Sequence, residues 1–451
     1  MHSRFFGRKY ETTMEQVKSL NIIKYSVFFL SFVLMILPGI TNKELADFHM
    51  YLLGILFLTE IRQVKAISLY SVWIAGFIYI ILSEMILSPE GDDFNWTVRY
   101  LLSANNVVLI GYSIAANKQL YKYKKTNFST RSQFFPFLLA LLTIFYLYNM
   151  FPKVSMSYFY GRQLVSTMGS GTLKGSLNSA LGLILPALIA YYVVHIKKSS
   201  KWVALAFVLP IFLFLIILST RFKLLFSVIP FFLVSGFLNF DKVNLKSMVL
   251  LLFAVVVLSL ISQLTKINRN ESYQNRWENL SERKMVNGNL AEIIANQCSP
   301  EGCVAMTRLA ERYFEDHEHT YGKSIGFITY FWVPRAIWPD KPTQVDHWLP
   351  RYFNPNMADT ASTASGFTGE LRADFGYLSY FFLFLLGVLL KRCNYYLMFY
   401  NYGRSPCYES IYASLLIPTT FFSLRGLNLS ITTYICAVLL LLLISKFIGV
   451  R

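Results

Sequence analysis

The chain has 451 residues, of which 55% are hydrophobic and only 15% are charged, whereas soluble domains carry about 25% charged residues. Its mean hydropathy is +0.44, and apolar stretches such as 202–219 and 248–264 are long enough to span, or nearly span, a bilayer. The formal charge of +17 does not indicate nucleic-acid binding, because the Lys and Arg residues gather in short loops between the apolar stretches. The composition excludes an ordinary soluble domain and predicts an all-α polytopic membrane protein.

The apolar stretches predict about twelve transmembrane helices. The first 20 residues are polar and basic and show no signal-peptide cleavage pattern, so we expect the first apolar stretch to be an uncleaved span. Because the second and tenth predicted spans are short, the expected number of transmembrane helices ranges from eleven to thirteen. The predicted spans are 22–41, 47–61, 66–86, 98–116, 134–151, 180–196, 202–219, 224–240, 247–264, 374–390, 408–424 and 429–448.

The basic residues alternate between loops in a way that predicts the orientation. With the amino terminus inside, the cytoplasmic loops 117–133, 197–201 and 391–407 are all rich in Lys and Arg, whereas the outer loop 87–97 is acidic. This distribution follows the positive-inside rule. Both termini are therefore expected in the cytoplasm, and the long polar insert of residues 265–375 is expected outside.

That insert is the main departure from a plain bundle of spans. It divides the chain into residues 1–264 with nine spans, a large outer loop of residues 265–373, and residues 374–451 with three spans. The insert holds 12 Lys and Arg and 14 Asp and Glu, a net charge of −2, so it is not a basic patch. Met306, Leu309, Ala310 and Tyr313 recur at helical spacing within it. A long ordered loop beside a bundle suits an enzyme that holds a polymeric substrate.

The cysteines agree with an external insert. Cys298 and Cys303 flank Pro-Glu-Gly and can close a small disulfide ring, which fits an oxidising compartment; two free thiols are the alternative. No Cys/His pattern has zinc spacing, and no metal is expected.

Several cations fall on the predicted outer side, where the positive-inside rule disfavours them. Arg221 and Arg425 each lie in a very tight hairpin, at the membrane boundary. Guanidinium groups bind phosphate through paired hydrogen bonds and keep their charge, so these positions suit an anionic lipid head group. The alternatives are snorkelling to lipid phosphates or pairing with Glu370 and Asp374. The other outer cations that we select are Arg162, Lys223, Arg335, Lys341, Arg351 and Arg372.

Two residues are candidate proton-transfer groups. Glu370 enters a span beside two glycines, where a substrate can approach closely, and an acid there is costly unless it is paired or functional. His347 follows Asp346 and is near Arg351 in the sequence, although a lone histidine in a loop is a weak signal. The run Asp316–His319 is more typical of a solvated face.

Four segments in order resemble one family. They are Ser-Thr-Arg-Phe-Lys at 219–223, Val-Pro-Arg-Ala-Ile-Trp-Pro-Asp-Lys-Pro at 333–342, Gly-Glu-Leu-Arg-Ala-Asp-Phe-Gly at 369–376 and Leu-Arg-Gly at 424–426. Over residues 150–430 the chain resembles the bacterial O-antigen polymerases of the Wzy type. The Trp-Pro-x-Lys-Pro element is the most specific part of the resemblance.

The resemblance implies a GT-C-like glycosyltransferase with a large helical periplasmic loop, acting at the periplasmic face of the bacterial inner membrane. Its substrate would be an oligosaccharide repeat unit on undecaprenyl diphosphate, transferred without nucleotide sugar, metal or other cofactor. Membrane lipid is a further expected partner, and a chain-length regulator is left open. Arg221 and Arg425 match the family positions expected to bind the diphosphate. Arg335, Lys341, Arg351 and Arg372 would complete the pocket or bind an acidic sugar.

Other roles stay open under this resemblance. Neither the family nor the sequence decides whether Glu370 or His347 acts as a base. Five aromatic residues of the insert can stack on sugar rings or form part of an interfacial aromatic belt: Trp332, Trp338, Trp348, Tyr352 and Phe353. The belt is slightly favoured for Trp332 and Trp338.

Two other functions compete with polymerisation. An O-antigen ligase has similar topology and the same donor, but the Trp-Pro-x-Lys-Pro element favours a polymerase. A non-enzymatic flippase for lipid-linked oligosaccharides would be expected to line a central cavity with charge. The predicted spans here are poor in charge, with Lys24, Glu84 and Glu409 as the few candidates.

Overall fold

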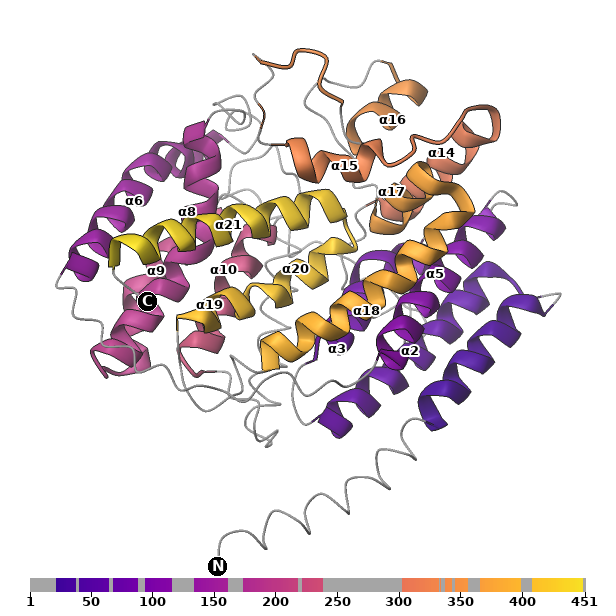
Figure 1. The fold of residues 1–451 in the computed structure, drawn as a ribbon, viewed down its shortest axis with the longest axis horizontal. Coiled ribbons are helices and arrows are strands. Elements are labelled where there is room, and N and C mark those ends of the chain that lie inside the picture. Colours follow the sequence, from indigo (N-terminus) through magenta and orange to yellow (C-terminus); the bar gives the residue numbers. More distant parts are fainter. Residues whose placement is uncertain are drawn as a thin grey trace, which may run out of the picture. The chain divides into compact units, whose positions relative to one another are not determined.

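The structure of the protein is a computed structural model (Figure 1), and all of its regular elements in the described residues are helical, with no strand among them. The described residues are 22–37, 40–64, 68–87, 94–115, 134–160, 173–217, 221–237, 302–331, 333, 337–342, 345–355, 366–398 and 408–448.

The chain divides into two compact units. The first comprises residues 1–116, 288–394 and 423–428, and the second comprises residues 117–287, 395–422 and 429–451. The described part of the insert therefore belongs to the first unit, together with the amino-terminal helices. The boundaries predicted from the sequence divide the chain into consecutive segments, whereas each of these two units groups segments that contact one another.

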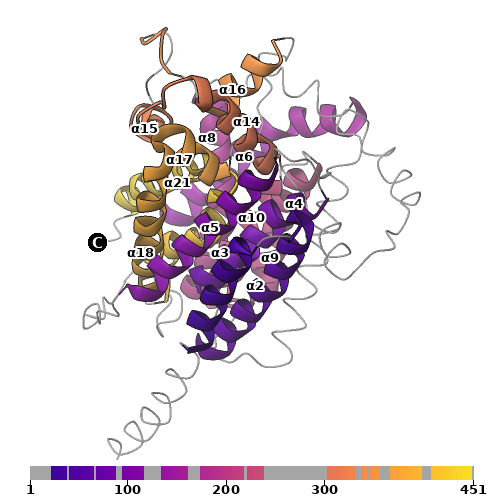
Figure 2. The same ribbon diagram turned by 90° about the vertical axis from the view of Figure 1, so that its right-hand side faces the viewer.

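The first unit contains a helix at Ile22–Ile36 and the helices of the insert. Figures 1 and 2 show α14, α15, α16 and α17 gathered at one end of the bundle of α2, α3, α5 and α18. The elements are α2 (Asn42–Val64), α3 (Leu69–Phe77), the π-helical turn η1 (Ile78–Leu82), α4 (Ser83–Leu87), α5 (Phe94–Ile114), α14 (Cys303–Asp316), α15 (Lys323–Tyr330), α16 (Val345–Phe353), α17 (Gly366–Phe375), the 3-10 turn η3 (Gly376–Leu378) and α18 (Ser379–Leu397).

Local sequence signals explain where two of these helices begin. Thr41 and Glu44 exchange hydrogen bonds at the start of α2, from the Thr41 backbone N to Glu44 Oε2 at 3.0 Å and from the Glu44 backbone N to Thr41 Oγ1 at 3.3 Å. Ser68 and Ser71 form the same reciprocal cap before α3. Such boxes satisfy backbone N–H groups that have no partner within the helix.

Glycines let α5 and α18 approach each other closely. A Cβ on Gly387 would lie 2.1 Å from the carbonyl oxygen of Val108, and one on Gly111 would lie 2.3 Å from that of Phe384. No side chain fits at either distance. Small residues at helix crossings are a common device of membrane proteins, because close packing replaces the hydrophobic driving force that lipid removes.

The second unit has a large apolar core, which includes Tyr146, Leu188, Ile211 and Phe231. Four of its helices contain an internal proline, at positions 152, 186, 210 and 230, and membrane helices tolerate this because neighbouring groups satisfy the freed backbone carbonyls. The elements are α6 (Phe134–Tyr160), α8 (Leu173–Ala190), the π-helical turn η2 (Tyr191–Ile196), α9 (Lys201–Ile217), α10 (Arg221–Val234), α19 (Glu409–Ser414), and most of α20 (Leu416–Ser423) and α21 (Leu427–Ile448).

The all-helical prediction is confirmed for the described residues. Three helices, Leu69–Leu87, Phe134–Ser155 and Gly366–Leu397, are long and apolar enough to cross a membrane, which is consistent with a helical membrane protein. Shorter apolar helices lie on five more of the predicted spans: Ile22–Ile36, Ala180–Ile196, Lys201–Ile216, Leu224–Val234 and Ile431–Lys446. The count of twelve spans stays a prediction, and the span at 247–264 lies outside the described residues.

Candidate functional site

The insert is fastened to the apolar segment 69–87 by one carboxylate. Glu84 is buried, and its Oε1 accepts a hydrogen bond from the backbone N of Ala305 at 3.1 Å, in the first turn of α14. Gly302 precedes α14 with a φ of +84° and supplies no side-chain cap. A negative charge at a helix N-terminus satisfies unpaired N–H groups and complements the helix dipole. Glu84 thus caps α14 from another segment of the chain.

A second attachment joins α14 to α17. The Arg372 guanidinium donates to Glu311 through two hydrogen bonds, Nη2 to Oε1 at 2.8 Å and Nε to Oε2 at 3.1 Å. It also lies 4.7 Å from the ring centre of Trp96 and 4.0 Å from that of Tyr377, within the range of cation–π attraction. Arg372 is 5% exposed. Two of the three guanidinium nitrogens are taken by Glu311 and the group is buried among aromatic rings, so the geometry favours a positioning role.

Two charged side chains hydrogen-bond to the two ends of α15: Asp374, close to the predicted residue Arg372 in the chain, and the predicted residue Lys341. Asp374 accepts hydrogen bonds from the backbone N of Ser324 at 3.1 Å and of Ile325 at 2.8 Å, and from the Thr320 hydroxyl. At the other end, Lys341 Nζ donates to the carbonyl oxygens of Phe331 at 2.8 Å and Val333 at 3.0 Å. Both charges have the sign that the helix dipole favours.

The lysine of the Trp-Pro-x-Lys-Pro element therefore organises the insert. Lys341 is 8% exposed, and its ammonium also lies 5.0 Å from the ring centre of Phe327. A buried ammonium that donates to two carbonyls is poorly placed to receive a phosphate from solvent. Its predicted role in substrate binding has no support from this geometry.

Two other predicted residues come together at the start of α17. The backbone N of Gly366 donates to the Arg425 carbonyl oxygen at 2.9 Å, and the backbone N of Phe367 donates to that of Leu424 at 3.3 Å. Glu370 is 3% exposed, and its Oε1 lies 3.2 Å from where a Cβ on Gly426 would be. The Arg425 side chain is half-buried. A buried carboxylate thus lies against the hairpin that carries a partly exposed arginine.

The amino-terminal end of α14 forms another wall of this region. A Cβ on Gly366 would lie 3.2 Å from the Cβ of Cys303, and Cys303 Sγ lies 4.0 Å from the Leu424 carbonyl oxygen. A carboxylate next to the reacting proton can act as a general base, and a cation or a hydrogen-bond donor stabilises a departing anion. Glu370 and Arg425 supply these two chemical types in one place, and we call them the Glu370–Arg425 site.

For the other predicted residues, the described part of the chain neither adds a contact with this site nor tests their predicted roles. Arg351 is half-buried on α16, and His347 lies on the same helix but its side chain is outside the described part. Arg221 and Lys223 form the first turn of α10 in the second unit, again without described side chains. A joint diphosphate site of Arg221 and Arg425 stays a prediction. Arg162, Arg335 and Cys298, and with Cys298 the predicted disulfide, lie outside the described residues.

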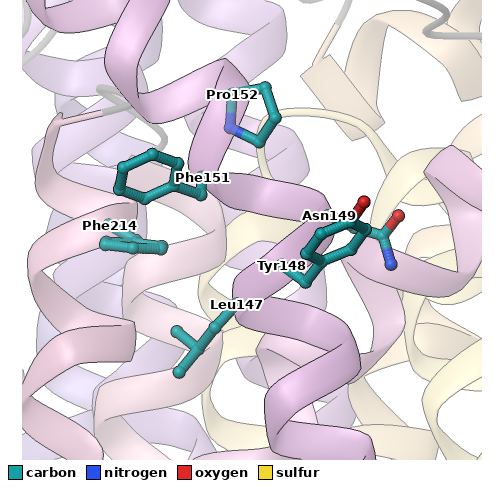
Figure 3. Close-up of a pocket in the computed structure, with 6 residues that line it drawn as sticks. All are labelled: Leu147, Tyr148, Asn149, Phe151, Pro152 and Phe214. Atoms are coloured by element: carbon teal, nitrogen blue, oxygen red, sulfur yellow. The ribbon is translucent and has the colours of Figure 1, made fainter.

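A cavity of about 520 Å³ opens on the second unit (Figure 3). Its lining is mainly apolar, and the Asn149 amide donates to the Phe145 carbonyl oxygen of its own helix at 2.7 Å. Tyr148 and Phe151 are 78% and 64% exposed, so the lining faces outward from the unit. The lining residues are Leu147, Tyr148, Asn149, Phe151 and Pro152 of α6 and Phe214 of α9.

Comparison of the chain with family models, with curated proteins and with solved structures finds no match. Among the residues that the structure describes, no group of three His, Cys, Asp or Glu side chains is arranged to hold a metal ion.

Proposed function

We propose that the protein is a membrane glycosyltransferase that polymerises lipid-linked oligosaccharide repeat units, the O-antigen polymerase reaction, at the outer face of the bacterial inner membrane. The observation that carries the proposal is the Glu370–Arg425 site. It lies where α17 of the insert meets the Arg425 hairpin. Glu84 fastens the insert to an apolar helix, and Arg372 joins α14 to α17. An insert attached in this way suits an enzyme that holds a long glycan above the membrane.

The site's chemistry suits this transfer. A sugar hydroxyl of the incoming lipid-linked unit attacks the anomeric carbon of the growing chain. The new C–O bond forms as the bond from that carbon to the diphosphate oxygen breaks, and the diphosphate leaves with the bonding electrons. Glu370 takes the hydroxyl proton as general base. Arg425 stabilises the negative charge that develops on the diphosphate, with Arg221 as a second cation under the predicted topology.

The cavity on α6 and α9 of the second unit, taken by itself, suits a hydrocarbon chain because its lining is mainly apolar. The predicted topology places the end of α6 at the outer leaflet, and Lys153 follows Pro152 there. An apolar groove beside a lysine fits a polyprenyl chain whose charged end lies at the membrane surface.

Gene deletion in the host bacterium tests the function. A polymerase deletion leaves lipopolysaccharide capped with one repeat unit, whereas a ligase deletion leaves no O-unit on the lipid A core. Unchanged long chains after deletion would exclude both enzymes. Loss of every O-unit would exclude the polymerase and favour the ligase.

Single substitutions test the site. Glu370→Gln should lower polymerisation about 10²- to 10⁴-fold, as expected for loss of a general base, and Arg425→Ala about 10²- to 10³-fold. Arg425→Lys should recover little, because an ammonium cannot make the paired contact of a guanidinium. Arg312→Ala and Glu315→Gln, at exposed positions on α14, are the matched controls. Wild-type ladders from both site variants, at normal protein levels, would refute the site.

A further inference from the structure

The insert carries a cluster of aromatic rings at the end of α14 that lies away from the Glu370–Arg425 site. Its centre is Tyr313, which stacks on His317 with ring centres 4.1 Å apart and meets Trp348 at 5.0 Å and Tyr352 at 4.8 Å. Tyr352 meets Phe353 at 5.2 Å. We call these five residues, from α14 and α16 and the turn between α14 and α15, the ring surface.

The ring surface is partly core and partly exposed. Tyr313 and Trp348 pack on the small apolar core that includes Met306 and Leu349, which fixes their positions. Tyr352 is 54% exposed and Phe353 is 39% exposed, and His317 is exposed as well. These aromatic side chains pack on the core on one side and face solvent on the other. They therefore lose little conformational entropy when a ligand binds.

The rim of the ring surface is polar and carries both signs of charge, with Arg312 exposed beside Tyr313 and Arg351 half-buried beside Tyr352. The Nδ1–H of His317 donates to the Tyr313 carbonyl oxygen at 2.9 Å, which leaves Nε2 for another partner. Asp316, Glu318 and Asn354 are exposed around it. Carboxylates repel anionic lipid heads and nucleic-acid phosphates, but they accept hydrogen bonds from hydroxyl groups. A sugar has a face of C–H groups and a rim of hydroxyls. It therefore matches apolar ring faces that are bordered by groups able to accept hydrogen bonds from hydroxyls.

The direction of α14 links this surface to the proposed chemistry. Cys303 begins α14 beside Leu424 of the Arg425 hairpin, and Tyr313 lies ten residues further along the helix, which is about 15 Å at the rise of an α-helix. A glycan whose reacting end lies at the Glu370–Arg425 site can therefore reach the ring surface with sugars further along its chain.

We propose that the ring surface binds sugar residues of the glycan at a distance from the reacting end and retains the chain between successive transfers. This inference rests on the proposed function for its substrate. The surface takes no part in the bond-forming step, so its loss should shorten the chains without abolishing the first transfer.

The test uses the full-length protein and the double variant Tyr352→Ala/Phe353→Ala, which changes the two exposed hydrophobic rings and leaves Tyr313 and Trp348 in the core. Tyr321→Ala is the matched control, because Tyr321 is 72% exposed on the same insert and belongs to no ring contact among the described residues. We expect the double variant to give a ladder whose modal chain length is several-fold shorter, with two-unit products still formed, and the control to give the wild-type ladder.

A binding measurement separates this proposal from the proposed function. Purified protein in lipid nanodiscs is titrated with the repeat-unit oligosaccharide released from its lipid, by isothermal calorimetry. Two lost ring contacts should weaken binding about tenfold or more. Equal affinity of the wild type and the double variant would overturn the proposal, as would a full-length ladder. Complete loss of transfer at normal protein levels would also overturn it, because the surface would then serve the chemical step.

Failure of the proposed function gives a different result. Deletion of the gene would then leave the lipopolysaccharide either unchanged or without any O-unit, whatever the oligosaccharide titration shows. A shortened ladder in cells without a change in oligosaccharide affinity would instead identify a protein partner as the occupant of the ring surface.

Discussion

Removal of the Glu311 carboxylate tests whether Arg372 positions the insert or binds substrate. Loss of one partner from a buried ion pair costs about 3–5 kcal/mol. The Glu311 side chain keeps 21% exposure, and the rings of Trp96 and Tyr377 still contact the guanidinium after the change. We therefore expect Glu311→Gln to weaken the attachment of α14 by about 2–3 kcal/mol.

Hydrogen–deuterium exchange of the purified protein measures this loss directly. At about 1.4 kcal/mol per factor of ten, the protection of α14 amides should fall about 30- to 150-fold. Arg372→Ala should give a similar fall. The double variant Glu311→Gln/Arg372→Ala should be little worse than either single one, because the two side chains act as a pair.

The control is Glu315→Gln, at an exposed position on the same helix, which should leave α14 protected. The opposite result is also informative. If Glu311→Gln leaves protection unchanged and raises the affinity for lipid-linked diphosphate, then Arg372 is a substrate-binding residue that Glu311 masks. That outcome would refute the positioning role.

Two further predictions concern packing and capping. Gly387→Ala should prevent accumulation of folded protein, because its Cβ would lie 2.1 Å from the Val108 carbonyl oxygen. The control Gly54→Ala should be tolerated, because its Cβ would meet nothing within 4 Å. Size-exclusion chromatography of fluorescent fusions compares the amounts of folded protein. Asp374→Asn and Lys341→Met should each lower the amide protection of α15 about 5- to 30-fold, the effect of about 1–2 kcal/mol at a helix end, and should leave α14 protected.

The sequence predicts helices better than it predicts the partners of charged residues. The predicted spans at 134–151 and 202–219 overlap α6 and α9 closely, because long apolar stretches bounded by basic loops are a local signal. The predicted span 374–390 falls within the apolar helical segment Gly366–Leu397, but that segment is interrupted: Gly376 takes a φ of +55°, and a short 3-10 turn separates α17 from α18. A single glycine does not reveal such a break by its sequence.

The candidate site shows the same limit. Glu370 and Arg425 could each be selected from sequence as costly charges near a membrane boundary. The pairing of their segments could not, because it depends on backbone hydrogen bonds between residues far apart in the chain. The sequence shows Glu84 as an acid in an apolar stretch, but no residue near it in the chain indicates that it caps α14. No sequence pattern indicates that Glu311 binds Arg372.

A charge near the predicted membrane boundary is therefore an ambiguous sign of function in this chain. Arg372 and Asp374 are buried against a protein carboxylate and against backbone N–H groups, respectively, which offsets their desolvation. Such contacts fix α14, α15 and α17 relative to one another, and that rigidity is what a substrate site needs from its supports. Arg425 differs because its side chain stays partly exposed beside a buried carboxylate. Partial exposure next to an organised support, rather than charge alone, is the property that favours Arg425 over Arg372 and Lys341 as a ligand of the proposed diphosphate.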